Sequence, residues 1–173
     1  MILQFRLLRS GIETRIRQAR SSDVAIIAEF NARLARETEQ RELELARVQA
    51  GVAALLSDLA KGTYFLAEVE NNGAPSVAGQ LLITYEWSDW RNGNFWWIQS
   101  VYVAEAFRGR GIFRALFEHV RALARAHRDV CGLRLYMDAN NGRARQAYER
   151  LGLKQTDYQV FELDFVLGKK VTE

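Results

Sequence analysis

The most informative segment of the sequence is Val101-Tyr102-Val103-Ala104-Glu105-Ala106-Phe107-Arg108-Gly109-Arg110-Gly111-Ile112-Phe113-Arg114-Ala115-Leu116. A run of apolar and branched residues, typical of a strand, leads into a loop with two glycines and then into an amphipathic helix. Glycines allow backbone N–H groups to turn inward. The N–H groups of a first helical turn lack intrahelical partners and lie at the positive end of the helix dipole. The segment therefore predicts a site for a phosphate or diphosphate.

Three arginines strengthen this interpretation, because Arg108, Arg110 and Arg114 add cations whose geometry matches phosphate. The segment is neither a Rossmann nor a Walker loop, since it lacks both Gly-x-Gly-x-x-Gly and Gly-Lys-Ser/Thr. On the loop alone, an ordinary helix start with a solvated arginine face remains an alternative. The helix is expected to run from Arg110 or Gly111 to about residue 128, with His119 and His127 at its solvent margin.

The rest of the chain alternates between strand and helix patterns. After a strand over 14–19, we expect helices over 24–37 and 45–60, then strands over 64–69, 77–87 and 95–103. A strand over 132–138, a short helix over 142–151 and a last strand or hairpin over 153–165 follow the long helix. The order β-α-α-β-β-β-α-β-α-β predicts one mixed α/β domain.

Composition excludes several classes of protein. The 173 residues are 49% hydrophobic and 26% charged, with a formal net charge of +3, which suits an anionic ligand but does not indicate nucleic acid. No run is long enough to span a membrane. Cys131 is the only cysteine, so a reducing cytoplasm is the simplest compartment. Arginines interrupt the apolar run of residues 1–9, which we interpret as a tail or extra strand rather than a targeting signal.

A second segment, residues 133–153, together with the first, resembles a known family. Arg108-Gly109-Arg110-Gly111-Ile112 is similar to the acetyl-CoA loop Arg/Gln-x-x-Gly-x-Gly/Ala of the GNAT superfamily of N-acetyltransferases. Asn141, Ala144, Tyr148 and Gly152 match its other pattern, Asn-x-x-Ala-x-x-x-Tyr-x-x-x-Gly-Phe. The loop departs from the pattern at Phe113, where the family has Gly or Ala, a change that is tolerable if the ring points into the core.

The resemblance implies a GNAT fold: a twisted, mixed and mostly antiparallel sheet of six to seven strands flanked by about four helices. The domain would span 14–166, with an N-terminal extension over 1–13 and a C-terminal tail over 167–173. The implied activity is transfer of an acetyl group from acetyl-CoA to a primary amine of a small molecule, or of a peptide, in a cytoplasmic homodimer without a metal. A CoA-binding regulator with weak or lost catalysis and an arginine-loop nucleic-acid binder remain the alternatives.

In the family, the strand before the loop carries a bulge, and its backbone binds the pantetheine arm. The residues that the resemblance assigns to acetyl-CoA are Val101, Tyr102, Val103, Arg108, Gly109, Arg110, Gly111, Ile112, Phe113, Arg114, Asn141, Ala144 and Tyr148. Tyr148 is also the implied general acid, which protonates the leaving sulfur, since a tyrosine of ordinary pKa keeps its proton at neutral pH. Read without the family, Tyr148 is a buried aromatic on an apolar helix stripe.

The catalytic base is not evident. Many GNAT enzymes carry a glutamate on the strand before the loop, but this chain has Gln99, and a neutral amide is no base. We therefore keep Gln99 as a catalytic position and consider Glu86, Asp89 and Tyr102 as bases, alongside a water chain or an amine that arrives neutral. For each carboxylate, the alternative is a solvated strand end.

The acceptor is expected between the early helices and the central strands, where acidic and aromatic residues suit a cationic amine. The candidate substrate-binding residues are Phe30, Glu37, Thr38, Glu39, Trp87 and Trp97. The alternative is that the tryptophans pack a core or a dimer interface. The segments 35–39 and 158–165 resemble most the polyamine-type and uncharacterised bacterial members of the family.

Overall fold

A computed structural model describes residues 12–167, which divide into two compact units with the boundary between Tyr136 and Met137. The N-terminal extension expected over 1–13 and the tail expected over 167–173 therefore lie almost entirely outside the described residues. The domain boundaries expected at 14 and 166 stay predictions.

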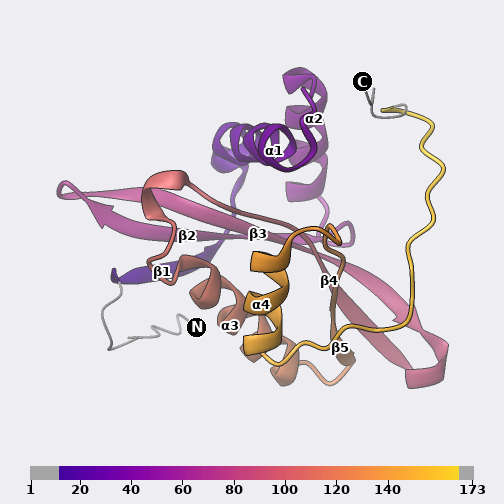
Figure 1. Cartoon of the computed structure of the whole chain (residues 1–173). Coiled ribbons are helices and arrows are strands. Elements are labelled where there is room, and N and C mark those ends of the chain that lie inside the picture. Colours follow the sequence, from indigo (N-terminus) through magenta and orange to yellow (C-terminus); the bar gives the residue numbers. More distant parts are fainter. Residues whose placement is uncertain (1–11, 168–173) are drawn as a thin grey trace. The chain divides into compact units, whose positions relative to one another are not determined.

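The first unit is built on one mixed sheet with strand order β1-β2-β3-β4-β5. Neighbours are antiparallel from β1 to β4, and β5 runs parallel to β4. Figure 1 shows the long β3–β4 hairpin extending past the shorter strands. The strands are β1 (Thr14–Gln18), β2 (Thr63–Asn71), β3 (Ala74–Ser88), β4 (Gly93–Val103) and β5 (Val130–Leu135).

Helices cover both faces of this sheet. Helices α1 (Val24–Glu39) and α2 (Leu45–Leu56) lie on one face, and α3 (Ile112–Ala126) lies on the other (Figure 1). The apolar stripe expected for α3 is buried, and Ile112, Leu116 and Val120 have almost no exposed surface. His119 is half-buried rather than at the solvent margin, because its ring packs against Phe65 of β2 with centroids 5.2 Å apart.

Short 3₁₀ turns connect these elements: η1 (Ser21–Asp23), η2 (Asp89–Arg91) and η3 (Glu105–Phe107). The predicted helices and inner strands are confirmed to within a few residues, although α2 ends at Leu56 rather than at 60. The second unit contains α4 (Gly142–Arg150), whose N-cap is Asn141: its side-chain oxygen accepts a hydrogen bond from Ala144 N at 3.0 Å.

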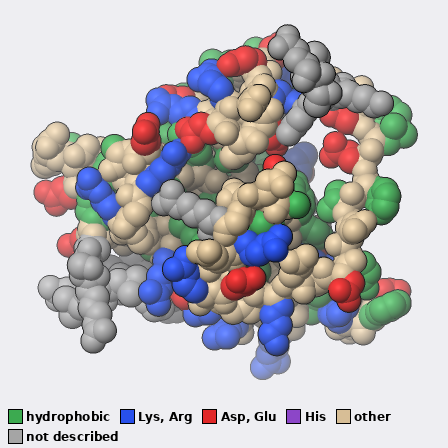
Figure 2. Space-filling view, in the orientation of Figure 1, with side chains coloured by type: hydrophobic (Ala, Val, Ile, Leu, Met, Phe, Trp, Pro, Cys, Tyr) green, Lys and Arg blue, Asp and Glu red, His purple; other side chains and the backbone are tan. Residues whose placement is uncertain are grey.

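The last predicted strand is wrong. Residues 153–165 form no strand in the described chain, and the sheet has five strands rather than six or seven. Side chains of residues 154–165 are exposed, among them Phe161 at 91% and Phe165 at 89%, and Figure 2 shows hydrophobic groups along this segment. Alternating apolar residues indicate side chains that could cover one face of a sheet. A strand also needs a neighbouring strand to pair with its backbone N–H and C=O groups.

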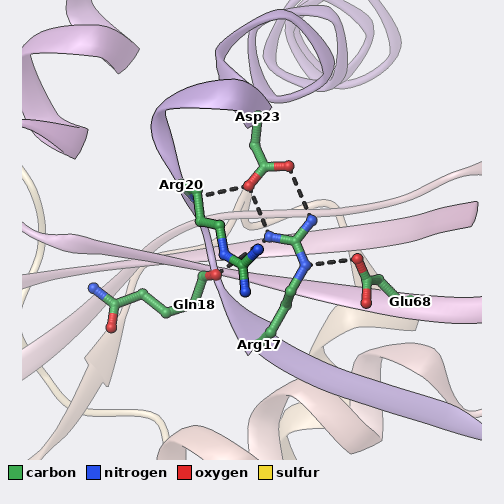
Figure 3. Close-up of polar contacts among 5 residues, drawn as sticks. All are labelled: Arg17, Gln18, Arg20, Asp23 and Glu68. Atoms are coloured by element: carbon green, nitrogen blue, oxygen red, sulfur yellow. Dashed lines mark hydrogen bonds and ion pairs between the residues drawn. The ribbon is translucent and has the colours of Figure 1, made fainter. Parts of the chain in front are cut away.

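An ion-pair network holds the start of α1 against the sheet (Figure 3). Arg17 of β1 donates two hydrogen bonds to Asp23, at 2.7 and 2.9 Å, and a third to Glu68 of β2 at 2.6 Å. Asp23 also accepts from Arg20 N at 2.7 Å. The hydrogen bonds from Arg17 lower the pKa of Asp23 despite its burial, so this carboxylate is charged in the folded protein.

We expect Asp23→Asn to lower the free energy of unfolding by roughly 2–3 kcal/mol at neutral pH, below the full value for a buried pair because Glu68 remains. The folded-state pKa of Asp23 is depressed, so its contribution is fully present above the ordinary value of 3.8 and is lost as pH falls through the folded pKa. Urea unfolding from pH 7 to pH 3 measures this. The difference between the two proteins should shrink at acidic pH.

Asp58→Asn is the matched control, since Asp58 pairs with Lys61 on the surface and should barely change the unfolding midpoint. A difference between Asp23→Asn and the parent that is constant across the pH range would show that Asp23 acts by packing and not by charge.

Candidate active site

An extra residue interrupts the pairing of β4 with β3. Leu82 lies opposite Ser100 and the next residue, Ile83, lies opposite Ile98, so Gln99 has no partner on β3. After this extra residue, the side chains of β4 point to the opposite faces from those that regular alternation would give. The Trp96 ring packs against His127 at the end of α3, whereas the ring of Tyr102, six residues on, packs against Phe30 of α1. An even separation keeps two residues on one face of a regular strand, so the bulge turns the end of β4 over.

The same point marks the end of pairing with β5. That strand pairs with Asn94–Ile98 only, so residues 99–103 of β4 have β3 on one side and no strand on the other among the described residues. An unpaired strand edge presents free N–H and C=O groups. This open edge therefore offers backbone hydrogen bonds to an extended ligand, directly before the glycine loop.

The loop itself is shaped to approach an anion. Gly109 and Gly111 have φ of 74° and 84°, which glycine adopts without strain, and a Cβ at either position would meet no atom within 4 Å. Gly111 is the N-cap of α3, whose first-turn amides lack intrahelical acceptors. Ile112 is buried in the core, and the Phe113 ring packs along the helix against Phe117 at 6.2 Å. These residues fit a diphosphate at the start of α3.

Arg108 is held by the protein rather than left free. Its Nε donates to the Val103 carbonyl at 2.9 Å, and its Nη2 donates to Glu37 Oε2 at 2.5 Å. The Tyr102 hydroxyl donates to the other Glu37 oxygen at 2.9 Å. Burial pushes the pKa of Glu37 upward, but these hydrogen bonds and the charge of Arg108 outweigh it and lower the pKa. Glu37 thus joins α1 to the loop, and its expected contact with the acceptor stays a prediction.

Arg110 and Arg114 differ from Arg108. Both are exposed, and neither makes an ion pair within residues 12–167. The Arg110 guanidinium lies over the Phe107 ring, 5.9 Å from its centroid. Their charges are therefore free to attract an anion at the helix start.

Gln99 is fixed at both ends of its amide, on the face of the sheet that α1 covers. Its Nε2 donates to Thr84 Oγ1 at 2.8 Å, and its Oε1 accepts from the Tyr136 hydroxyl at 2.9 Å. An amide has no basic lone pair to offer. Gln99 can therefore orient neighbouring groups but cannot take a proton.

Glu86 lies two residues along β3 from Thr84, on the same face. One of its oxygens accepts from Arg134 Nη1 of β5 at 2.6 Å, and the other accepts from the indole N–H of Trp97. The guanidinium of Arg134 also stacks on the Phe95 ring, 3.7 Å from the centroid. The structure thus brings Glu86 and Trp97 together, as a half-exposed pair beside an arginine.

The other expected acceptor residues do not converge on this face. Phe30 is buried, with 3% of its surface exposed, and the Thr38 hydroxyl donates to Leu34 O within α1 at 2.8 Å. Glu39 is the exposed last residue of α1. Trp87 alternates with Glu86 along β3 and so points to the opposite face from Trp97.

Three residues of this face were not singled out in the sequence: Thr84, Arg134 and Tyr136. Arg134 lies opposite Trp97 in the register of β4 with β5, and Trp97 lies opposite Thr84 of β3. The period of two from Gly132 through Arg134 to Tyr136 was the available signal, because it places an arginine and a tyrosine on one face of a strand.

In the second unit, Ala144 and Tyr148 lie one turn apart on α4, after the cap made by Asn141. Burial raises the pKa of Tyr148, so its hydroxyl holds its proton at neutral pH. The side chain can therefore donate a proton but is a poor base.

An open bulged strand, a glycine loop at a helix start and a mixed sheet fit the class of CoA-dependent acyltransferases that the sequence resemblance implies. Residues 27–153 match the family model described as the acetyltransferase (GNAT) family. A solved structure described as a possible acetyltransferase from Clostridium difficile 630 is 42% identical, over 88% of this chain and 98% of that chain, with a TM-score of 0.80. The chain belongs to the GNAT family and is an acetyl-CoA-dependent N-acetyltransferase.

More distant structures share the fold. Ribosomal-protein-alanine N-acetyltransferase from Brucella melitensis biovar Abortus 2308 is 19% identical, over 88% of this chain and 99% of that one, with a TM-score of 0.66. Aminoglycoside N-acetyltransferase AAC(6')-Iy in complex with CoA is 15% identical, over 92% and 99%, with a TM-score of 0.71. No match was found among curated proteins. None of the described helices is both long and apolar enough to cross a membrane.

The loop geometry predicts different effects for its arginines. Arg110→Ala and Arg114→Ala should each weaken acetyl-CoA binding several-fold without changing the melting temperature, because each removes an exposed cation. Arg108→Ala should weaken binding and also lower the melting temperature, because it removes the contacts to Val103 and Glu37. Calorimetry and thermal unfolding measure both quantities. Equal melting temperatures for all three variants would contradict the structural role of Arg108.

Proposed function

We propose that this enzyme acetylates a primary amine of a small molecule, which binds on the α1 side of the sheet over β3, β4 and β5. The observation that carries the proposal is the bulge at Gln99, because it coincides with the open edge of β4 and lies beside half-exposed polar and aromatic side chains. Acetyl-CoA, when bound, supplies the acetyl group as a reactive thioester. The open edge of residues 99–103 would hold its extended arm, and the α3 start with Arg110 and Arg114 its phosphates.

For the general acid we propose Tyr148. Support comes from its place in the family pattern and from its raised pKa, which keeps the hydroxyl protonated at neutral pH. Asn141 and Ala144 would contribute through the first turn of α4, where the Asn141 side chain already caps the helix.

For the base we propose water rather than a side chain. Gln99 is an amide, and Glu86 lies two residues along β3 from the Thr84 that contacts Gln99, which is about 6.6 Å from the bulge. Tyr102 donates to Glu37, and burial raises its pKa, so it does not accept a proton at neutral pH. Asp89 accepts from Trp90 N at 2.8 Å within η2, at the turn of the hairpin. The acceptor amine would therefore react in its neutral form and release its proton to solvent.

Tyr148→Phe tests the acid. It keeps the ring and removes only the hydroxyl, so kcat should fall by about 10²–10⁴-fold. The dissociation constant of acetyl-CoA should stay nearly the same, because the proposed phosphate contacts come from the α3 loop. Steady-state kinetics with calorimetry measure both. A fully active Tyr148→Phe would mean that the residue serves only in packing.

The proposed absence of a side-chain base predicts a particular pH dependence. Below the pKa of the acceptor amine, kcat/KM should rise tenfold per pH unit, because only the neutral amine reacts, and it should level off above that pKa. Changing to an acceptor of lower pKa should move the profile to lower pH by the same amount. Gln99→Glu, which introduces a carboxylate at the bulge, should add a second inflection. A profile that ignores the pKa of the acceptor would instead indicate a protein base.

The small-molecule acceptor, the cytoplasmic location and the homodimer expected from the sequence stay predictions. An acetyl-CoA consumption screen across amino acids, polyamines, aminoglycosides and peptides separates an active enzyme from a CoA-binding regulator. On the face that Figure 2 shows, Lys and Arg side chains alternate with Asp and Glu, which does not favour a nucleic-acid partner.

A further inference from the structure

The polar and aromatic groups on the α1 side of the sheet follow one another in order. Next to the bulge, the Gln99 amide lies between Thr84 and the Tyr136 hydroxyl. The Trp97 ring comes next, 5.8 Å from the Tyr136 ring. Beyond them, Glu86 and Arg134 form an ion pair over Phe95.

Strand geometry sets the length of this series. Glu86 follows Thr84 by two residues, which is about 6.6 Å along a strand. The series therefore has a neutral polar end at Gln99 and a charged end at Glu86 and Arg134. The rings of Trp97 and Tyr136 form the aromatic surface between these two ends. The ion pair is accessible, because 41% of the Glu86 side chain and 31% of the Arg134 side chain are exposed.

Both charged groups keep capacity for a ligand. Among residues 12–167, Arg134 gives one hydrogen bond, from Nη1 to Glu86, and a guanidinium has five N–H donors. Each Glu86 oxygen accepts one hydrogen bond, from Arg134 or from Trp97, and a carboxylate has about four acceptor positions. An isolated half-exposed pair adds little to stability. An ammonium and a carboxylate on neighbouring atoms of a ligand would complete both sets of contacts.

We propose that the acceptor is an α,ω-diamino acid, acetylated on its ω-nitrogen. This inference rests on the proposed function, which places the reacting amine beside the bulge. The α-carboxylate would bind Arg134, the α-ammonium would bind Glu86, and the methylenes would lie on the Trp97 and Tyr136 rings. Four or five single bonds of about 1.5 Å separate the ω-nitrogen from the α-carbon, which suits the distance between the two ends. The bond from the acetyl carbon to the ω-nitrogen forms as its bond to sulfur breaks. The nitrogen loses one proton to water, and the departing thiolate takes one from the proposed general acid, which solvent then reprotonates.

Simpler amines satisfy the site less well. A diamine or polyamine brings a second cation towards Arg134, and like charges repel. An ω-amino acid without an α-amine binds Arg134 but leaves Glu86 without an added partner. The α,ω-diamino acid alone among these presents both charges at the far end of the site.

The experiment compares three acceptors of equal chain length: lysine, cadaverine, which lacks the carboxylate, and 6-aminohexanoate, which lacks the α-amine. The parent enzyme should prefer lysine to each analogue by about 10- to 100-fold in kcat/KM, the range for one hydrogen-bonded charge. Arg134→Gln should abolish the preference over cadaverine and keep that over 6-aminohexanoate. Glu86→Gln should do the reverse. Ornithine, putrescine and 5-aminopentanoate repeat the comparison for a chain one methylene shorter.

Arg47→Gln is the matched control, because it breaks an exposed pair with Glu44 on α2 and should leave every ratio unchanged. Arg134→Lys keeps the charge without the forked donors and should retain part of the preference for lysine over cadaverine, which a purely structural role would not predict. Thermal unfolding confirms that each variant is folded.

The outcomes separate this inference from the proposed function. If the enzyme turns over lysine and both analogues with equal kcat/KM, the proposed diamino-acid acceptor is wrong and the proposed acetyltransferase activity stands. The same holds if neither Arg134→Gln nor Glu86→Gln changes the kcat/KM ratios between lysine and its analogues. Acetyl-CoA binding without turnover of any amine would overturn the proposed function and this inference with it.

Discussion

Gln99 enters β4 opposite the step from Leu82 to Ile83, and this one extra residue sets the geometry of the site. It turns the end of β4 over, so that the Tyr102 ring faces α1 and its hydroxyl reaches Glu37. Pairing with β5 also stops at Ile98, so the backbone of 99–103 stays open on that side among the described residues. A regular β4 would keep its phase, direct Tyr102 towards α3 and remove the contact between α1 and the glycine loop.

The three arginines of the loop have different tasks. Arg108 is used within the protein, where it binds the Val103 carbonyl and Glu37 and so connects β4, the loop and the end of α1. Arg110 and Arg114 are left exposed. Arg108 thereby fixes the shape of the loop, and in the proposed site the two exposed arginines would attract the anion. This division explains how a protein of formal net charge only +3 can present a locally positive helix start.

Local features were predictable from the sequence, and features that depend on register were not. The N-cap at Asn141, the start of α3 at the second glycine and the buried stripe of α3 follow from residues close together in the chain. The ion pair of Glu86 with Arg134 joins residues 48 apart and depends on how β5 aligns with β4. The prediction of a strand over 153–165 was wrong for a related reason. Apolar alternation is a property of one segment, whereas a strand also needs a second segment to pair with.

In the proposed site, recognition of the acceptor is separated from the chemical step. A primary amine of pKa near 10.4 is neutral in about one molecule in a thousand at pH 7.4, which costs about 4 kcal/mol when no side chain removes the proton. A carboxylate beside the reacting nitrogen would hold it as an ammonium through their attraction, and Gln99 avoids this. The charged pair lies instead about two strand residues away, where each hydrogen-bonded charge is worth about 1.5–3 kcal/mol. Binding at that distance can offset the cost of presenting a neutral nucleophile at the bulge.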